Sequence, residues 1–391
     1  MFYENKKENF IKYVIFFLLI IIIFMLWIMV MKIDYTNQNI AGNYKTEKID
    51  RQISDNDGKS SGEIGNLEKE ELMDLVEDEK KNRENMIEKV SKSVVGISKI
   101  KQNDASVFIE DSEVKLGLGS GVIISENGYI LSNAHVVGSK YSNCFVTLEN
   151  GKNYTADVVW VDENIDLAII KILAYGLNEI KLGDSDSIYL AEDVYAIGNP
   201  IGFEFQRTVT KGIISGINRT IKIESEFENQ YMEDLIQTDT TINEGNSGGA
   251  LINSDGELIG INTVKLSDAD GIGFAVPINI VKPIIDRLLE EKVFEEAYLG
   301  LAGFDKEVIP YLDKSIEIDT GVYVAKVNID GPLFTSNVLE GDIILEVDDK
   351  KISKMNELKK IIYSKKPGDK VKLKIKRHLT EFEIEVVLGK K

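Results

Sequence analysis

The chain has 391 residues, of which 43% are hydrophobic and 8% aromatic, enough to build the packed cores of two or three domains. Its formal net charge of −19 argues against a dedicated nucleic-acid binder, because such proteins carry a basic face. A single cysteine excludes an intrachain disulfide, and with only two histidines the chain has too few ligands for a zinc cluster.

The first long apolar segment, Tyr13 to Met31, carries no charge over its whole length. As a helix it would be about 28 Å long, close to the ~30 Å hydrocarbon core of a bilayer. A cleaved signal peptide is the alternative, but the segment is longer than such peptides require and no clear cleavage site follows. We therefore expect a single-pass signal anchor in the cell membrane. Lys6, Lys7 and Lys12 precede it and only Lys32 follows directly, so the positive-inside rule places the N-terminus in the cytoplasm and the rest outside.

The next segment, residues 32–85, is predicted to be a linker that contains a helix. Its first part, Asp34 to Asn66, is polar without an apolar period and is typical of a flexible tether. From Leu67 to Lys92, scattered apolar residues among dense mixed charge indicate an exposed helix.

From Val94 onward the pattern changes to short β-branched or alternating runs separated by turn signals such as Glu126-Asn127-Gly128. Such repetition predicts an all-β barrel or sandwich over about residues 90 to 280. A helix from Pro283 to Glu291 is expected to close this body, for which we assign the boundaries 86–290.

Three residues at predicted strand edges have the chemistry of a nucleophilic triad. Ser247 lies between Gly245 and Gly249 in a glycine-rich turn, which can expose a hydroxyl beside backbone N–H donors. Each residue alone has an ordinary explanation: the turn could be a plain β-turn, His135 a structural hydrogen-bonder and Asp166 a cap. Together they follow the chain order His, Asp, Ser of chymotrypsin-type proteases.

In that interpretation each residue has a distinct role. Ser247 attacks the scissile carbonyl, and His135 accepts the hydroxyl proton and returns it to the leaving amine. Asp166 orients the imidazole and stabilises its cation. The backbone N–H groups of Gly245 and Ser247, together with that of Asn246, are expected to form the oxyanion hole.

The sequence resembles the HtrA/Deg family of serine proteases in five separated blocks that occur in the family's order. These blocks are SNAHVV around His135, NIDLAIIKI around Asp166, GDSDSIYLAEDVYAIGNPIGF from Gly183, LIQTDTTINEGNSGGALIN around Ser247 and GIGFAVP from Gly271. The resemblance implies a mostly β, trypsin-like double six-stranded β-barrel with this triad, with Gly245 as an oxyanion donor and with no metal or organic cofactor. It also implies a homotrimer built through the protease domains.

Two segments near the site are interpreted through the same resemblance. Glu244 departs from the Arg or Pro that commonly precedes GNSGG in the family, and it adjoins the loop that must form the oxyanion hole. The segment from Arg219 to Asp234 occupies the place of the family's sensor loop.

The primary specificity pocket is predicted from spacing. Thr241, six residues before the nucleophile, takes the position at the base of the pocket in trypsin-like folds, and it is uncharged. Ile242 is its neighbour, with ordinary core as the alternative interpretation, and family resemblance places Leu266 on a wall. We therefore predict cleavage after small aliphatic residues such as Val, Ala or Thr.

The last hundred residues, 291–391, resemble a PDZ domain, with about five strands and one or two helices. The sequence Tyr298, Leu299, Gly300 and Leu301 takes the place of that family's carboxylate-binding loop, so its amides are expected to bind a peptide C-terminus while the peptide adds as a strand.

Helix residues further along complete this prediction: Leu358, Ile361 and Ile362 are expected to supply core and one wall of the groove. The lysines between Lys350 and Lys376 are interpreted as a solvated face.

Taken together, the sequence predicts a membrane-anchored serine endopeptidase that cleaves unfolded or exposed polypeptides outside the cytoplasm, in protein quality control or stress response. Peptide C-termini bound by the PDZ domain would regulate it. The alternatives are a signalling protease that cuts a single site and a non-catalytic chaperone or PDZ adaptor, against which the intact triad argues.

Overall fold

A computed structural model of the chain describes residues 61–100, 116–138, 144–199, 208–223, 230–243, 245–265, 271–291 and 294–391. The chain divides into two units, residues 1–71 and 72–391, and the first is described only from Ser61. Within the described ranges no helix is both long and apolar enough to cross a membrane. The predicted anchor, Tyr13 to Met31, lies outside them.

The first described element is the helix α2 (Ser61–Ser91), which begins inside the segment predicted to be a tether. Residues 76–85 of this helix are exposed, as expected from their charge. Its last turns differ, because Met86, Ile87 and Val90 pack against the core of the protein body. Met86 lies against Gly256, where a side chain would collide with it. Gly256 also has φ of +76°, a conformation that glycine adopts readily.

The first β-barrel is closed in the strand order β1-β2-β3-β6-β5-β4. Gly128, with φ of +91°, allows the predicted turn between β2 and β3. The apolar run of β6 is almost wholly buried, and a short helix, α3 (Ala134–Val137), follows β3. The strands are β1 (Val94–Ile100), β2 (Leu116–Ile123), β3 (Tyr129–Ser132), β4 (Cys144–Thr147), β5 (Asn153–Asp162) and β6 (Leu167–Ile172).

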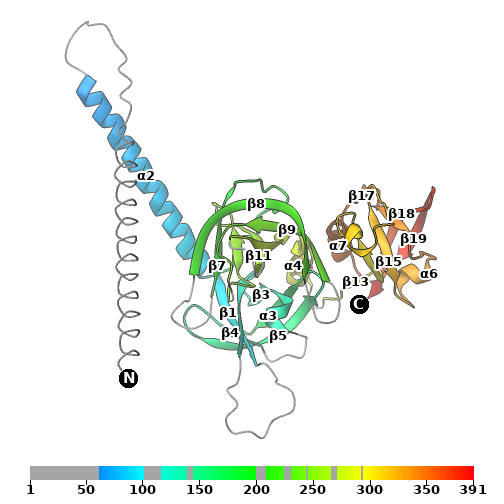
Figure 1. The fold of residues 1–391 in the computed structure, drawn as a ribbon. Helices are drawn as coiled ribbons and strands as arrows, with labels where there is room; N and C mark the ends of the chain where they lie inside the picture. Colours follow the sequence, from blue (N-terminus) through cyan, green and yellow to red (C-terminus); the bar gives the residue numbers. More distant parts are fainter. Residues whose placement is uncertain are drawn as a thin grey trace, which may run out of the picture. The chain divides into compact units, whose positions relative to one another are not determined.

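The second barrel is closed in the order β10-β11-β12-β9-β8-β7, so the predicted double β-barrel is confirmed. Figure 1 shows the long strand β8 curving around this barrel. Its strands are β7 (Asp193–Gly198), β8 (Thr208–Ile223), β9 (Gln230–Thr238), β10 (Ala250–Ile252), β11 (Leu258–Lys265) and β12 (Gly273–Pro277).

Two features of the second barrel bear on the sequence predictions. The predicted closing helix is present as α4 (Lys282–Glu290), preceded by the 3-10 turn η2 (Ile278–Ile280). In the proposed sensor segment, residues 219–223 and 230–234 lie in the paired strands β8 and β9. Residues 224–229 lie outside the described ranges.

The C-terminal domain has its own apolar core beneath a sheet in the order β14-β15-β16-β18-β19, with β17 paired to β16 and β13 paired to β20. It therefore has more strands than the five predicted, the additional ones being very short. The strands are β13 (Ala297–Tyr298), β14 (Leu301–Phe304), β15 (Val322–Val327), β16 (Ile343–Val347), β17 (Lys350–Lys351), β18 (Lys370–Arg377), β19 (Thr380–Val387) and β20 (Gly389–Lys390). The helices are α5 (Ile309–Leu312), α6 (Pro332–Thr335) and α7 (Met355–Tyr363).

Helix α7 joins the C-terminal domain to the barrels through Tyr363, which is only 4% exposed. Its ring packs edge-on against Trp160 at 5.8 Å, and its hydroxyl donates to the carboxylate of Asp162 at the end of β5. Burial alone would raise the pKa of the Asp162 carboxyl, but Lys359, Lys391 and the tyrosine hydroxyl outweigh it and lower the pKa to about 2. Lys359 is thus a partly buried partner of Asp162, and the prediction of a wholly solvated lysine face is wrong at this position.

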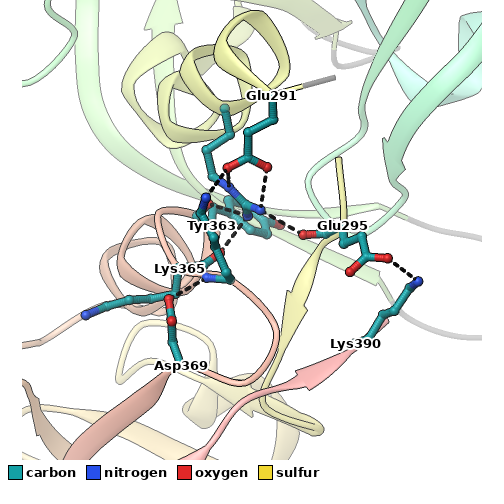
Figure 2. A network of polar contacts seen from close by, with 8 residues as sticks. Glu291, Glu295, Tyr363, Lys365, Asp369 and Lys390 are labelled. Carbon is teal, nitrogen blue, oxygen red and sulfur yellow. Dashed lines mark hydrogen bonds and ion pairs between the residues drawn. The ribbon is translucent and has the colours of Figure 1, made fainter. Parts of the chain in front are cut away.

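Arg287 of α4 fixes the end of α7 from the barrel side. Its guanidinium donates to the carbonyl oxygens of Lys365 (2.5 Å) and Glu295 (3.0 Å) and pairs with Glu291 (3.2 Å), and a longer contact of 3.5 Å reaches the carbonyl of Tyr363 (Figure 2). The last carbonyl groups of a helix lack hydrogen-bond partners within the helix, and the Arg287 guanidinium provides donors for them here. The two domains consequently meet through a buried, hydrogen-bonded interface.

Candidate active site

The turn before β6 presents Asp166 toward the seam between the barrels. Asp166 has φ of +53°, a left-handed conformation that aspartate tolerates better than most residues. Its carbonyl oxygen accepts hydrogen bonds from the Ala134 amide (3.2 Å) and from the side chain of Asn133 (2.9 Å). The carboxylate-bearing residue is therefore fixed by the segment that carries the histidine.

The structure brings His135 and Asp166 together as predicted from their order. His135 Nδ1 lies 2.8 Å from Asp166 Oδ2, and the His135 amide donates to Asp166 Oδ1 at 3.0 Å. This double contact orients the imidazole so that its second nitrogen, Nε2, is turned away from the carboxylate and available for proton transfer. The His135 side chain is 52% exposed, so a substrate can reach it.

Ser247 joins this pair through Thr263 of β11, a residue that the sequence motifs did not reveal. The Thr263 hydroxyl donates to Asp166 Oδ2 at 2.7 Å, and its carbonyl accepts the hydrogen bond of Ser247 Oγ at 2.9 Å. The serine hydroxyl thus points at the Thr263 carbonyl in this conformation, and its proton must turn toward His135 before attack.

The predicted oxyanion loop is buried at Gly245 and Asn246, and Gly245 has φ of +99°. The Asn246 amide donates to the Asn243 carbonyl at 2.9 Å, so it is already engaged and does not point at a substrate. The amides of Gly245 and Ser247 donate to no residue that the structure describes, which leaves them for an oxyanion. Glu244 lies outside the described ranges.

The residues of the predicted specificity pocket are placed in part. Thr241 is exposed, whereas Ile242 is 3% exposed and lies so close to Gly273 that a side chain there would collide with it. The Thr241 carbonyl accepts a hydrogen bond from the side chain of Asn246 at 3.2 Å, which ties the oxyanion loop to the predicted base of the pocket. Leu266 lies outside the described ranges.

The predicted carboxylate-binding loop borders a cavity of about 550 Å³. Gly300 has φ of +83°, which a residue with a side chain resists, and its carbonyl accepts the Asn328 amide at 2.9 Å. Leu358 and Ile362 of α7 line the same cavity, and so does Asp162 of the first barrel. Tyr298, Leu299 and Leu301 complete the loop on its side.

Metal ligands and the cysteine thiol are two further kinds of reactive group. Among the residues that the structure covers, no group of three or more His, Cys, Asp or Glu side chains could hold a metal ion. Burial raises the pKa of the Cys144 thiol to about 11, so it is unreactive near neutral pH.

Comparisons with known proteins agree with this architecture. The model of the trypsin-like peptidase domain matches residues 119–261, and that of the PDZ domain matches residues 258–388. The "Serine protease Do-like HtrA" of Bacillus subtilis is 38% identical over 326 residues, covering 78% of this chain and 72% of the relative. The "Probable periplasmic serine endoprotease DegP-like" of Halomonas elongata is 37% identical over 283 residues, covering 71% of this chain and 57% of the relative.

Solved structures give the same result. The "HtrA-type protease AlgW with tripeptide" is 32% identical with a TM-score of 0.58, covering 79% of this chain and 97% of that structure. A serine endoprotease from Yersinia pestis is 30% identical with a TM-score of 0.53, covering 79% of this chain and 98% of that structure.

Proposed function

Because the chain belongs to the HtrA family and is a serine endopeptidase, we propose that it cleaves unfolded or exposed polypeptides outside the cytoplasm in protein quality control. The observation that carries the chemistry is the hydrogen-bonded chain from His135 through Asp166 and Thr263 to Ser247. An extended, unfolded segment can enter a half-exposed site of this kind, whereas a folded protein does not offer its backbone.

The reaction follows from the geometry. Ser247 Oγ turns from Thr263 toward His135 Nε2, gives up its proton and attacks the scissile carbonyl carbon. Asp166 stabilises the imidazolium that forms, and the Gly245 and Ser247 amides bind the oxyanion. The C–N bond then breaks as His135 returns the proton to the leaving amine. Water, deprotonated by His135, releases the acyl group and regenerates Ser247.

Cleavage is proposed to follow small aliphatic residues. Thr241 and Ile242 are uncharged, so neither of these two residues can pair with the side chain of a substrate Lys or Arg. We expect the soluble region to cut a reduced, carboxymethylated test protein after Val, Ala or Thr, and to leave the same protein uncut when it is folded. Mass spectrometry of the fragment ends measures this, and dominant cleavage after Arg or Lys would contradict it.

We also propose that a peptide C-terminus bound between the Tyr298–Leu301 loop and α7 regulates the site. Asp162 lines the same cavity and ends strand β5, four residues before Asp166, so it leads directly into the turn that presents the catalytic carboxylate. A ligand that shifts α7 changes the contacts that Tyr363 and Lys359 make with Asp162. The turn that carries Asp166 then changes its position.

The variant Tyr363→Phe tests that regulation, because it keeps the ring against Trp160 and removes only the hydroxyl bond to Asp162. A buried hydrogen bond to a charged group is worth about 1.5–3 kcal/mol, so the factor by which a C-terminal peptide changes kcat/KM is expected to fall about tenfold or to disappear. Tyr311→Phe, at a tyrosine that is 67% exposed, is the control. An unchanged peptide response in Tyr363→Phe would refute this coupling.

The cellular setting is proposed from the sequence and the family. The apolar segment from Tyr13 to Met31 supports a single-pass anchor with both folded domains on the outer face, and family resemblance supports a homotrimer. Protease protection in sealed membrane vesicles and light scattering of the soluble region measure these two properties. Release of the full chain by high-salt or carbonate washing, or a monomeric mass, would contradict the respective proposal.

A further inference from the structure

We propose that Ser120, on strand β2 of the first barrel, is a positioning residue for the oxyanion hole. Ser120 is fully buried and reaches across the seam between the barrels to the loop that carries the nucleophile. It does not touch the reacting atoms; it holds the backbone that does.

The Ser120 hydroxyl has a full set of partners. It donates to the carbonyl oxygen of Gly245 at 2.6 Å and accepts from the backbone amide of Asn199 at 2.6 Å. A buried hydroxyl with both roles satisfied has one orientation, because any rotation breaks a bond that water cannot replace. The Gly245 carbonyl is therefore fixed in direction.

The backbone of Ser120 holds the other side of the loop. Its amide donates to the Ser247 carbonyl at 2.8 Å, and between these two contacts the Asn246 carbonyl accepts the Gly249 amide at 2.9 Å. Three consecutive carbonyls, at Gly245, Asn246 and Ser247, thus point to fixed partners. The Ser247 amide lies in one of the peptide planes that these bonds hold.

The Gly245 N–H lies in the peptide plane before the one that contains the Gly245 carbonyl. The hydrogen bond from the Ser120 hydroxyl to that carbonyl restrains this N–H as well. With its carbonyl held by Ser120, Gly245 keeps a fixed ψ, and the direction of its N–H then depends on its φ of +99°. Removing the hydroxyl leaves the Gly245 carbonyl and the Asn199 amide without this buried partner. The carbonyl then turns toward another donor, and the compensating rotation about φ of Gly245 carries its N–H away from the position of the oxyanion.

The variant Ser120→Ala is expected to lower kcat about tenfold to a hundredfold. Displacing an oxyanion-hole N–H costs only part of the transition-state stabilisation that its complete removal costs. KM stays within about twofold, since the contact matters in the transition state and not in substrate binding. The affinity for a peptide boronate, whose tetrahedral adduct places an oxygen in the hole, falls by the same factor as kcat.

Ser132→Ala provides a matched control. Ser132 is equally buried, and its hydroxyl donates to the Ser120 carbonyl at 2.6 Å, but it has no hydrogen bond to Gly245. General loosening of this cluster would affect both variants alike, so equal losses of kcat would overturn the proposal. A rise in KM with unchanged kcat in Ser120→Ala would also overturn it.

The inference rests on the endopeptidase activity, so hydrolysis by the native protein and its loss in Ser247→Ala are measured first. If native hydrolysis is present and Ser120→Ala retains full kcat, the positioning role alone fails. Should the alanine variant not fold, Ser120→Cys keeps a weak donor in nearly the same shape. It is expected to lose kcat and boronate affinity in parallel, and native values for both would contradict the proposal.

Discussion

Replacement of Ser247 with alanine is expected to lower kcat by about six orders of magnitude, the loss found when a triad nucleophile is removed in other serine proteases. Without Oγ no acyl intermediate forms, and only binding and the oxyanion amides remain to assist water. The fold should be unaffected, because Ser247 is only partly buried and its hydroxyl makes one hydrogen bond, to the Thr263 carbonyl. Hydrolysis of an unfolded test protein and the thermal unfolding midpoint measure the two effects.

Ser254→Ala is the control for that variant, since Ser254 lies exposed in the turn before β11. It should keep native kcat. Residual hydrolysis in Ser247→Ala above about a hundredth of the native rate would mean that another nucleophile carries the reaction.

Replacement of Asp166 with asparagine is expected to lower kcat by about four orders of magnitude. The amide cannot stabilise the imidazolium, and it offers a donor where His135 Nδ1–H needs an acceptor, so the imidazole takes the wrong tautomer. Asparagine tolerates the φ of +53° found at this position, so the turn and its bonds to Ala134 and Asn133 should survive. The loss is therefore electrostatic in origin and not a collapse of the site.

The pH profile distinguishes this cause from misfolding. Asp166→Asn should recover part of its activity at alkaline pH, where hydroxide replaces the missing base, and its unfolding midpoint should stay near the native value. Asp157→Asn, on the exposed face of β5, serves as the control. A kcat within tenfold of the native value for Asp166→Asn would exclude its role as the orienting acid.

Much of the fold could be predicted because its determinants are local. Turn signals such as Glu126-Asn127-Gly128 and short β-branched runs mark the strands, and the positive φ of Gly128 supplies the reason. The His, Asp, Ser order could be recognised because the chain order of the triad accompanies the fold. The turns and strands depend on residues that are neighbours in the sequence, whereas the triad is recognised from the order of three separated motifs.

The supports of the site could not be predicted in the same way. Ser120 meets Gly245 across 125 positions and Thr263 meets Asp166 across 97, contacts that exist only after both barrels have closed. A buried serine or threonine in a strand carries no sequence signal of its partner. The specificity of these contacts comes from barrel register, which single-chain periodicity does not encode.

The helix α7 shows the same limit at the level of domains. Its apolar spacing predicted that Leu358 and Ile362 are buried, and they are 1% and 6% exposed. The spacing did not reveal that Tyr363 enters the core of the barrels or that Lys359 is paired with Asp162. The apolar spacing of a helix predicts which of its residues are buried. It does not predict which residues they pack against.

The central claim is that Ser247 is the nucleophile of a triad that is assembled in the folded chain. The most direct measurement is the reaction of the soluble region with a fluorophosphonate, with the modified residue located by mass spectrometry of the digested protein. A single adduct on Ser247, absent from Ser247→Ala and strongly slowed in Asp166→Asn, is the predicted result. An adduct on another residue, or labelling that survives in Ser247→Ala, would contradict it.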